Sequence, residues 1–377
     1  MTNNSNPQGW KECKLGGIAV FQRGHDLPKT EMNVGVIPVA GSNGVIGYHN
    51  KATTKGPGIT IGRSGNIGTP KFYTSDFWAH NTVLYVKDFK GNDEKFLFYF
   101  LHIFDFSGFN AGSAVPTLNR NHIHEIPVII PPFPEQCAIA GVLSSLDDKI
   151  DLLHRQNKTL EAMAEALWRK MFVEEAEEKN DNGKLGDVVA SANTGLDAIK
   201  RAPIVEKDTG IKCLRIQDVS QSKTFDRWGF TEVSEQNFEK FQLRKDDIIM
   251  ARTCSPGINY FVREDLKAVF NNGLVRIRAD KSKVYPIFLY CLFKTREFIG
   301  HIDGISGGTS VQLNMQVGEL LDYNFSFPSL AYQEKILGQF VSIDNKIFKN
   351  HKQIHTLSRL RDTLIPKLMS GEVRVNA

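Results

Sequence analysis

Two long stretches of the chain carry apolar residues at alternating spacings of three and four. The apolar positions run from Ile139 to Met171 in the first stretch and from Ile336 to Leu368 in the second. This heptad spacing predicts two helices that pair through an apolar seam, because a seven-residue repeat keeps one face against a helical partner. Elsewhere, turn residues recur about every eight to twelve positions among β-branched and aromatic residues, which is typical of sheet-rich domains.

The two helical stretches are copies of one another. Leu143–Phe172 and Phe340–Met369 align at an offset of 197 residues, and ten of the 30 aligned pairs are identical. Gln136 and Gln333, just upstream, keep the same offset. Such a period is far too long for a solenoid. It indicates two copies of one large module, and a two-copy module suggests a two-part target.

The repeat divides the chain into four segments. We expect a first sheet-rich domain at 1–132, a first helix at 133–180, a second sheet-rich domain at 181–328, and a second helix with a C-terminal tail at 329–377. The charged end of the first helical segment, Glu174–Lys184, is interpreted as a linker or solvated helix end. Pro366 is expected to kink or end the second helix. The predicted fold is α+β, with two sheet-rich domains separated by an antiparallel two-helix coiled coil.

Each seam contains one asparagine, Asn157 in the first helix and Asn350 in the second. A buried asparagine is costly unless it is paired, and such residues fix the register of helix pairs. Placing the two face to face requires antiparallel helices and pairs residues whose numbers sum to 507. Every other seam pair is then apolar except Leu146 with Arg361.

The two sheet-rich domains share only weak sequence echoes. Ile249–Thr253 is similar to Thr60–Ser64, and Lys184–Gly186 is similar to Lys14–Gly16. A third echo links 308–314 with 112–119. The helical parts therefore do one job twice, whereas the sheet-rich parts do related jobs on different objects.

Composition and charge narrow the class of protein. The chain has 377 residues, 41% hydrophobic and 23% charged, which suits a folded protein of two to three domains. Its apolar runs are too short to span a bilayer and no N-terminal signal is visible, so no membrane is expected. The five cysteines show no C-x-x-C spacing, which favours a reducing cytoplasm. A net charge of +4 permits nucleic-acid binding without demanding it.

Known catalytic motifs are missing from the sequence. Ile130–Phe133 has the outline of an amino-methyltransferase motif, but Ile130 cannot accept a hydrogen bond from a target amine. There is no G-x-x-x-x-G-K-S/T phosphate loop and no H-E-x-x-H zinc motif. His122 and His124 lie beside Glu125, which alone does not define a metal site. We therefore expect no catalytic residue, cofactor or metal in this chain.

Two glycine-bounded segments carry side chains suited to DNA. Gly41–Gly44 contains Asn43, and Gly62–Asn66 contains Arg63 and Ser64. Arginine reads guanine with two hydrogen bonds and asparagine reads adenine, and either side chain can instead hold phosphate. The alternative is that these segments are hairpin turns, where Gly and Asn are favoured for backbone reasons. The residues alone favour the turn interpretation.

The order of these segments resembles the specificity subunit of type I restriction-modification enzymes over almost the whole chain. The resemblance is carried by Pro38–Tyr48, Gly62–Gly65, Pro116–Arg120, Ile129–Gln136 with the following Leu-x-x-Leu-Asp-x-x-Ile helix, and Leu368–Val375. The second domain departs more, with Gln312 in place of the Pro-Thr of the first. The order and the duplication of the segments carry the match.

The resemblance implies a division of labour. Each sheet-rich domain is then a target-recognition domain that reads one half of a bipartite sequence in double-stranded DNA. The helices space the domains and bind two modification subunits, which methylate adenine, and motor-nuclease subunits join for cleavage. The specificity subunit itself is non-catalytic. S-adenosylmethionine, ATP and Mg are expected in the partner subunits and no cofactor in this chain.

Given the resemblance, Gly41–Gly44 and Gly62–Asn66 can be both hairpin turns and loops that face DNA. The candidate DNA-binding residues are Asn43, Lys51, Arg63, Ser64, Asn66, Lys71 and Arg120 in the first domain and Arg252, Thr253 and Asn259 in the second. The lysines suit phosphate contacts, although most lysines are simply solvated. Two alternatives stay open: a coiled-coil interaction scaffold without DNA-sequence specificity, and a cryptic enzyme in the sheet domains. Salt-dependent binding to DNA would distinguish a DNA-specificity subunit from both of these alternatives.

Overall fold

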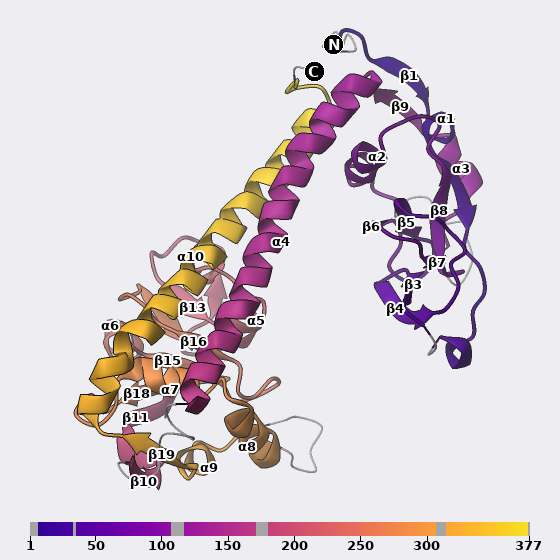
Figure 1. Cartoon of the computed structure of the whole chain (residues 1–377). Helices are drawn as coiled ribbons and strands as arrows, with labels where there is room; N and C mark the ends of the chain where they lie inside the picture. The colour runs from indigo at the N-terminus through magenta and orange to yellow at the C-terminus, as the bar shows by residue number, and fades with distance from the viewer. Residues whose placement is uncertain (1–6, 33–34, 107–116, 171–179, 307–313, 376–377) are drawn as a thin grey trace. The chain divides into compact units, whose positions relative to one another are not determined.

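The computed structural model describes residues 7–32, 35–106, 117–170, 180–306 and 314–375. The chain forms two compact units, Met1–Leu152 with Thr356–Ala377 and Leu153–His355. Each unit contains one sheet-rich domain and parts of the two long helices, α4 (Phe133–Arg169) and α10 (Leu330–Met369) (Figure 1). Within the described parts of the chain, no helix is both long enough and apolar enough to cross a membrane.

The first sheet-rich domain contains two sheets and a separate pair of strands. A four-stranded antiparallel sheet has the order β2-β8-β5-β6, a three-stranded sheet has the order β4-β3-β7, and β1 pairs with β9. The strands are β1 (Lys11–Lys14), β2 (Val20–Arg23), β3 (Ile37–Gly41), β4 (Gly44–His49), β5 (Gly58–Gly62), β6 (Pro70–Tyr73), β7 (Trp78–Ala79), β8 (Val83–Asp88) and β9 (Pro127–Ile130). The helices are α1 (Leu15–Ile18), η1 (Lys29–Glu31), α2 (Glu94–Leu101) and α3 (Arg120–His124).

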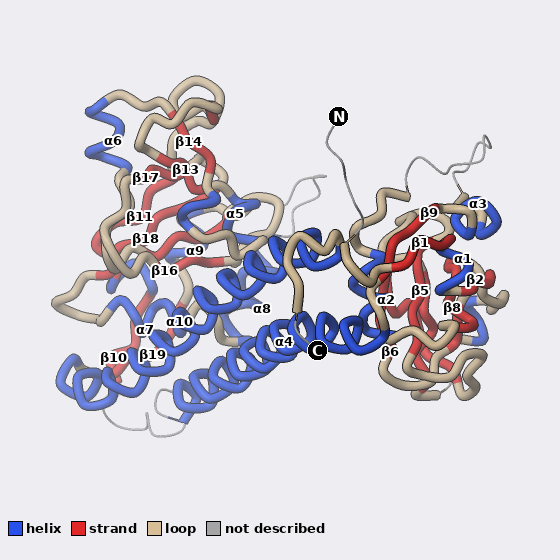
Figure 2. Tube along the Cα trace, turned by 90° about the horizontal axis from the view of Figure 1, so that it is seen from above, coloured by secondary structure: helices blue, strands red, loops and turns tan. Residues whose placement is uncertain are grey.

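The core of this domain lies between the four-stranded sheet and α2. Every residue of β5 is buried, which suits a central strand covered on both faces. Helix α2 packs on β5 and β6 (Figure 2) and buries Phe96 and Phe100 completely. Asp93 caps α2 by accepting a hydrogen bond from the Phe96 amide at 2.7 Å. The sheet and its loops therefore rest on a rigid support.

The second sheet-rich domain contains two four-stranded sheets and a separate pair. The sheet orders are β11-β18-β15-β16 and β12-β14-β13-β17, and β10 pairs with β19. The strands are β10 (Asn180–Lys184), β11 (Val189–Thr194), β12 (Ile204–Val205), β13 (Lys212–Leu214), β14 (Gly229–Thr231), β15 (Ile248–Ala251), β16 (Asn259–Phe261), β17 (Ala268–Phe270), β18 (Leu274–Ala279) and β19 (Asn324–Pro328). The helices are η4 (Leu185–Val188), α5 (Ile216–Ser220), η5 (Phe225–Arg227), α6 (Glu235–Phe241), α7 (Pro286–Leu292), α8 (Arg296–Ser306) and α9 (Val317–Leu321).

The two domains have the same strand connectivity. The sheet β2-β8-β5-β6 corresponds to β11-β18-β15-β16, and all neighbours in both are antiparallel. Strand β3 pairs antiparallel with β4 and parallel with β7, just as β13 pairs antiparallel with β14 and parallel with β17. Gly24 and Gly195 occupy equivalent places, and a Cβ on either would collide with backbone carbonyls of the neighbouring strand connection. The duplication therefore includes the sheet domains, although their sequences have diverged.

The two long helices pair antiparallel within each unit. In the second unit, Asn350 Nδ2 donates a hydrogen bond to Asn157 Oδ1 at 2.8 Å, and Trp168 meets Phe340 with ring centroids 6.5 Å apart. Both asparagines are buried, so the two seams meet in the register that the heptad pattern predicts. In the first unit, the residue opposite Arg361 is Asp147, which accepts a hydrogen bond at 2.7 Å. Arg361, which the heptad pattern places opposite Leu146, therefore pairs with the next residue of that helix, the acidic Asp147.

Two predictions about segment ends are wrong: that Pro366 ends the second helix, and that Asn180–Lys184 belongs to a linker. Helix α10 continues through Pro366 to Met369, and the Ser370 amide bonds the Pro366 carbonyl at 3.0 Å. The proline ring removes only the bond that the amide of residue 366 would make one turn back, and the helix continues for three more residues. The end of the expected linker, Asn180–Lys184, is strand β10, because its backbone pairs with β19. Residues 171–179 lie outside the described parts of the chain.

Replacing Asn350 by leucine should destabilise the second unit by about 1–3 kcal/mol, because Asn157 would lose its partner in a buried seam. The double variant Asn157→Leu with Asn350→Leu should recover most of this loss, since two leucines fill the seam without an unsatisfied amide. Guanidinium unfolding followed by helical circular dichroism measures both effects. A double variant that loses as much as the sum of the two single variants would contradict the pairing.

Candidate functional site

Three loops of the first domain meet at one end of its sheets. The Arg63 amide bonds the Thr82 carbonyl at 2.8 Å, and the Leu118 amide bonds the Arg63 carbonyl at 2.9 Å. A Cβ on Gly65 would lie 3.4 Å from Ser42 Oγ, so the β3–β4 turn touches the loop that follows β5. We call these three segments, 41–44, 62–68 and 117–120, the first loop cluster. It brings together the predicted residues Asn43, Arg63, Ser64, Asn66 and Arg120.

The side chains of the first loop cluster face solvent to different degrees. Asn43, Asn66 and Arg120 are exposed, whereas Arg63 and Ser64 are half-buried. The guanidinium of Arg63 has no hydrogen bond or ion pair among the described residues. Asn66 accepts a hydrogen bond from Thr69 at 3.2 Å, which orders its amide.

The two candidate lysines lie outside this cluster. Lys51 follows β4 and is exposed, with its backbone amide bonded to His49 Nδ1 at 3.0 Å. Lys71 lies within β6, opposite Thr60 of β5, and is half-buried. In the part of the chain that the structure describes, no hydrogen bond links either lysine to the loops. The geometry therefore does not single out these two among the lysines.

The second domain repeats the same backbone arrangement. The Arg252 amide bonds the Gly273 carbonyl at 3.0 Å, and the Met315 amide bonds the Arg252 carbonyl at 2.7 Å. Thr253 forms a bridge with Asn314, as Ser64 does with Thr117 in the first domain. Arg252 and Thr253 thus occupy the places of Arg63 and Ser64, as the sequence echo predicts. We call 252–256, 271–273 and 314–315 the second loop cluster.

The two arginines differ in what their side chains do. Arg252 donates to Asn314 Oδ1 at 3.0 Å, to the Asn272 carbonyl at 3.3 Å and to the Met315 carbonyl at 3.5 Å. Its guanidinium therefore braces the second loop cluster, whereas that of Arg63 makes no such bond to the residues that the structure describes. Asn259 is also used internally, because it donates to the Phe293 carbonyl at 3.3 Å. Sequence alone could not show this, since the partners of both residues are distant along the chain.

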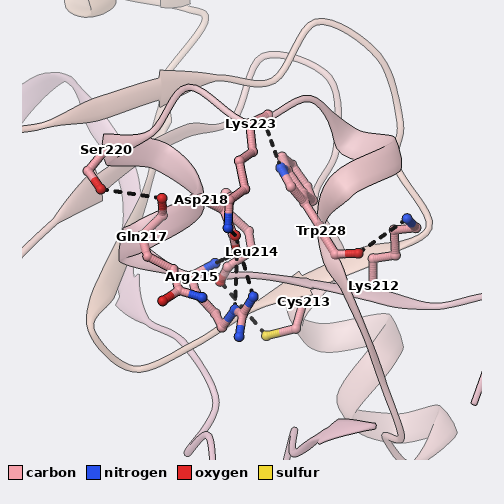
Figure 3. Close-up of polar contacts among 9 residues, drawn as sticks. All are labelled: Lys212, Cys213, Leu214, Arg215, Gln217, Asp218, Ser220, Lys223 and Trp228. Carbon is pink, nitrogen blue, oxygen red and sulfur yellow. Dashed lines mark hydrogen bonds and ion pairs between the residues drawn. The ribbon is translucent and has the colours of Figure 1, made fainter. Parts of the chain in front are cut away.

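The connection between β13 and β14 is a feature that the sequence analysis missed. Where the first domain has a short turn after β3, the second has a longer segment that includes α5 and η5. The carboxylate of Asp218 is fully buried and accepts from Arg215 at 3.1 Å and from Lys223 at 3.0 Å (Figure 3). Trp228 Nε1 donates to the Lys223 carbonyl at 3.0 Å, which closes the segment. The signal available in the sequence was the Arg-x-x-Asp spacing of a capped helix.

The repeated aspartates, Asp147 and Asp344, attach each long helix to a sheet-rich domain. In the first unit, the Tyr99 hydroxyl donates to Asp147 at 2.6 Å, and burial together with this carboxylate raises the pKa of Tyr99. In the second unit, Arg263 donates two hydrogen bonds to Asp344 at 2.7 and 2.9 Å. The same helical position therefore docks a different residue in each domain.

The repeated glutamines form a second attachment. Gln136 donates to the Pro131 carbonyl at 3.0 Å and accepts from the Asp93 amide at 3.1 Å. Gln333 donates to the Pro328 carbonyl at 2.8 Å, and it accepts from the amide at the start of α7 at 2.9 Å. Both glutamines are buried. Each glutamine ties the end of a strand and the start of a short helix to a long helix. This shared role explains why the 197-residue repeat includes Gln136 and Gln333, upstream of the heptad positions.

The family of the chain is shown by comparison with known proteins. Residues 7–162 and 177–357 match the family model described as "type I restriction modification DNA specificity domain". The chain therefore belongs to the family of type I restriction-modification specificity subunits. Among the described residues, no group of three or more His, Cys, Asp or Glu side chains is placed to hold a metal ion.

Individual relatives are distant but cover most of the chain. The chain is 23% identical to the type I restriction enzyme MjaIX specificity subunit of Methanocaldococcus jannaschii, over 97% of this chain and 80% of that protein. It is 22% identical to the MjaVIII specificity subunit of the same organism, over 75% of this chain and 71% of the relative. The crystal structure of the S subunit of a type I restriction-modification system from M. genitalium superposes with a TM-score of 0.66, at 17% identity and over 98% of both chains. This likeness shows the fold.

Proposed function

We propose that the chain is the non-catalytic subunit that gives a type I restriction-modification complex its DNA specificity. Each sheet-rich domain reads one half of a bipartite site in double-stranded DNA. One observation carries this proposal: two domains with the same connectivity hold an Arg-Ser or Arg-Thr loop by the same backbone bonds, while the surrounding side chains differ. A constant scaffold with variable loops suits two different half-sites.

The repeated helices suit two copies of one partner. Four of the identical pairs are exposed in both copies and cannot be explained by the buried seam: Ser145/Ser342, Lys149/Lys346, His154/His351 and Thr159/Thr356. A surface that is repeated on two helices supports binding of two modification subunits, which would supply S-adenosylmethionine chemistry. Motor-nuclease subunits would add ATP and Mg for cleavage.

Binding to duplex DNA tests the proposal against the scaffold alternative. The full chain, with its modification subunit present, should bind one duplex in preference to unrelated competitors. Its affinity should also fall as salt rises, because phosphate contacts release counterions. Fluorescence anisotropy across a salt series measures both properties. A scaffold without DNA specificity shows neither the preference nor the salt slope.

Arg63→Ala should weaken only the half-site read by the first domain, by about 1–3 kcal/mol if the guanidinium contacts a base. Arg252→Ala should act only on the other half-site, and over several base positions, because Arg252 braces its loops. Competition binding with duplexes altered in one half-site at a time separates the two effects. Neither variant should reduce binding of the modification subunit.

The Arg63 variant has two informative alternatives. If Arg63→Ala lowers affinity equally for every sequence and flattens the salt slope, the residue contacts phosphate. If it changes nothing, the segment is only a turn and the base-reading assignment is wrong.

A further inference from the structure

The strand equivalence identifies a second-domain counterpart of Asn43. In the first domain the His80 amide bonds the Ala40 carbonyl at 3.0 Å, and in the second the Asn271 amide bonds the Leu214 carbonyl at 3.1 Å. Ala40 and Leu214 therefore mark the same place near the ends of β3 and β13. The third residue after each carries a carboxamide: Asn43 in the first domain and Gln217 in the second. Both are exposed.

Gln217 also belongs to the surface around Arg252. A Cβ on Gly273 would lie 2.5 Å from Ile216 Cδ1 and 3.2 Å from Thr253 Oγ1, so the start of α5 packs against the second loop cluster. In the first domain Ser42, the counterpart of Ile216, lies instead beside Gly65 of the first loop cluster. Gln217 is thus joined to the second loop cluster as Asn43 is joined to the first.

Arg215 holds the amide of Gln217 in one orientation. The orientation that satisfies both groups turns the Gln217 oxygen toward Arg215, at 2.9 Å from Nη2 and 3.1 Å from Nη1. Arg215 is itself fixed by the buried Asp218 carboxylate, which Lys223 also contacts (Figure 3). With its oxygen engaged, Gln217 presents its NH2 group, a pure donor, to the outside.

We propose that Gln217 is a specificity-determining residue of the second domain and that Arg215 is its positioning residue. The inference rests on the proposed function, in which this domain reads one half-site. A donor in the major groove selects a base that presents acceptors, and guanine presents two, N7 and O6. Adenine and thymine present one acceptor each, so the pair of acceptors on guanine assigns this base to Gln217. No hydrogen bond from the described residues engages the amide of Asn43, which can use both of its groups on adenine.

Selection from a library of randomised duplexes by the full chain tests this assignment. The wild type should select a G·C pair at one position of one half-site. Gln217→Ala should reduce that preference by roughly five-fold to 150-fold and leave every other position unchanged. Gln217→Glu replaces the outward donor by an acceptor of the same shape. This variant should invert the preference toward a base that presents a donor, cytosine or adenine.

Two further variants separate reading from folding. Arg215→Ala frees the Gln217 oxygen and should shift the same position toward adenine rather than abolish selectivity, which a merely structural role would not do. Asn43→Ala is the matched control and should change only the other half-site. Because Gln217 is exposed, its variants should unfold at the wild-type denaturant midpoint.

The outcomes distinguish this assignment from the proposed function. A wild type that selects a bipartite sequence, together with Gln217 variants whose sequence is unchanged, overturns the assignment alone. Equal weakening at all positions also overturns it, because Gln217 is then a phosphate contact. A wild type that selects no sequence refutes the proposed function and the assignment with it.

Discussion

Replacing Arg263 by alanine is expected to destabilise the second unit by about 3–5 kcal/mol. The side chains of Arg263 and Asp344 are only 17% and 11% exposed and share two hydrogen bonds. Arg263 also lies over the ring of Phe348, at 4.5 Å from its centroid. Removing the arginine leaves a buried carboxylate without its partner, which costs more than the pair itself contributes.

Denaturant unfolding with matched variants isolates this effect. Arg263→Ala combined with Asp344→Asn should recover a large part of the loss, because the second change removes the unpaired charge. Arg361→Ala, which breaks the more exposed pair with Asp147, serves as a comparison in the first unit. A loss below about 1 kcal/mol for Arg263→Ala would show that the pair behaves as an ordinary surface ion pair.

Lengthening both long helices is expected to lengthen the non-specific spacer between the half-sites. Helix α4 has 37 residues, or about 55 Å, and each added heptad contributes about 10 Å, equivalent to about three base pairs. One heptad added to both helices should therefore shift the selected spacer by about three base pairs and weaken binding, because the groove also turns by about a third of a turn. Three heptads add about 31 Å, close to one DNA turn, and should restore affinity.

The sequences of both half-sites should stay the same in these variants. Inserting a heptad into only one helix is the control, because it breaks the Asn157–Asn350 pair and should reduce stability instead of giving a new spacer. Selection from duplexes with variable spacers measures the outcome. A changed half-site with an unchanged spacer would contradict the division of labour between helices and sheet domains.

The helices were predictable from the sequence because their constraint is periodic and local. A heptad seam with one asparagine in each copy leaves few registers, and the hydrogen bond between Asn157 and Asn350 lies in the one that pairs them. The continuation of α10 past Pro366 was not predictable in the same way. Whether a proline ends a helix depends on how many bonds remain beyond it.

The equivalence of the sheet domains was largely hidden from the sequence. The equivalence depends on backbone hydrogen bonds, such as those of Arg63 and Arg252. Most side chains are compatible with these bonds, so the bonds place little constraint on the sequence. Glycines that face a carbonyl, such as Gly24 and Gly195, are among the few traces that the equivalence leaves in the sequence. Strand β10 looks like a linker in the sequence because its residues are polar and its pairing partner is distant along the chain.

The candidate site was predictable only in part. The loops around Arg63 and Arg252 were found because they follow buried strands and contain turn residues. The difference between the two guanidinium groups could not be predicted, because Arg252 is held by a hydrogen bond to Asn314, 62 residues away. Gln217 was missed because its position after the strand is visible only when β3 and β13 are superposed.

Mapping methylated bases in the genome of a host with and without this gene tests the central claim most directly. We expect one bipartite motif, with methylated adenine and a fixed non-specific spacer, that is present with the gene and lost without it. Altering Arg63 should then change one half of the motif and leave the other intact. Identical methylation in both strains, or a single uninterrupted motif that depends on the gene, would contradict the proposal that two recognition domains on one chain read two half-sites.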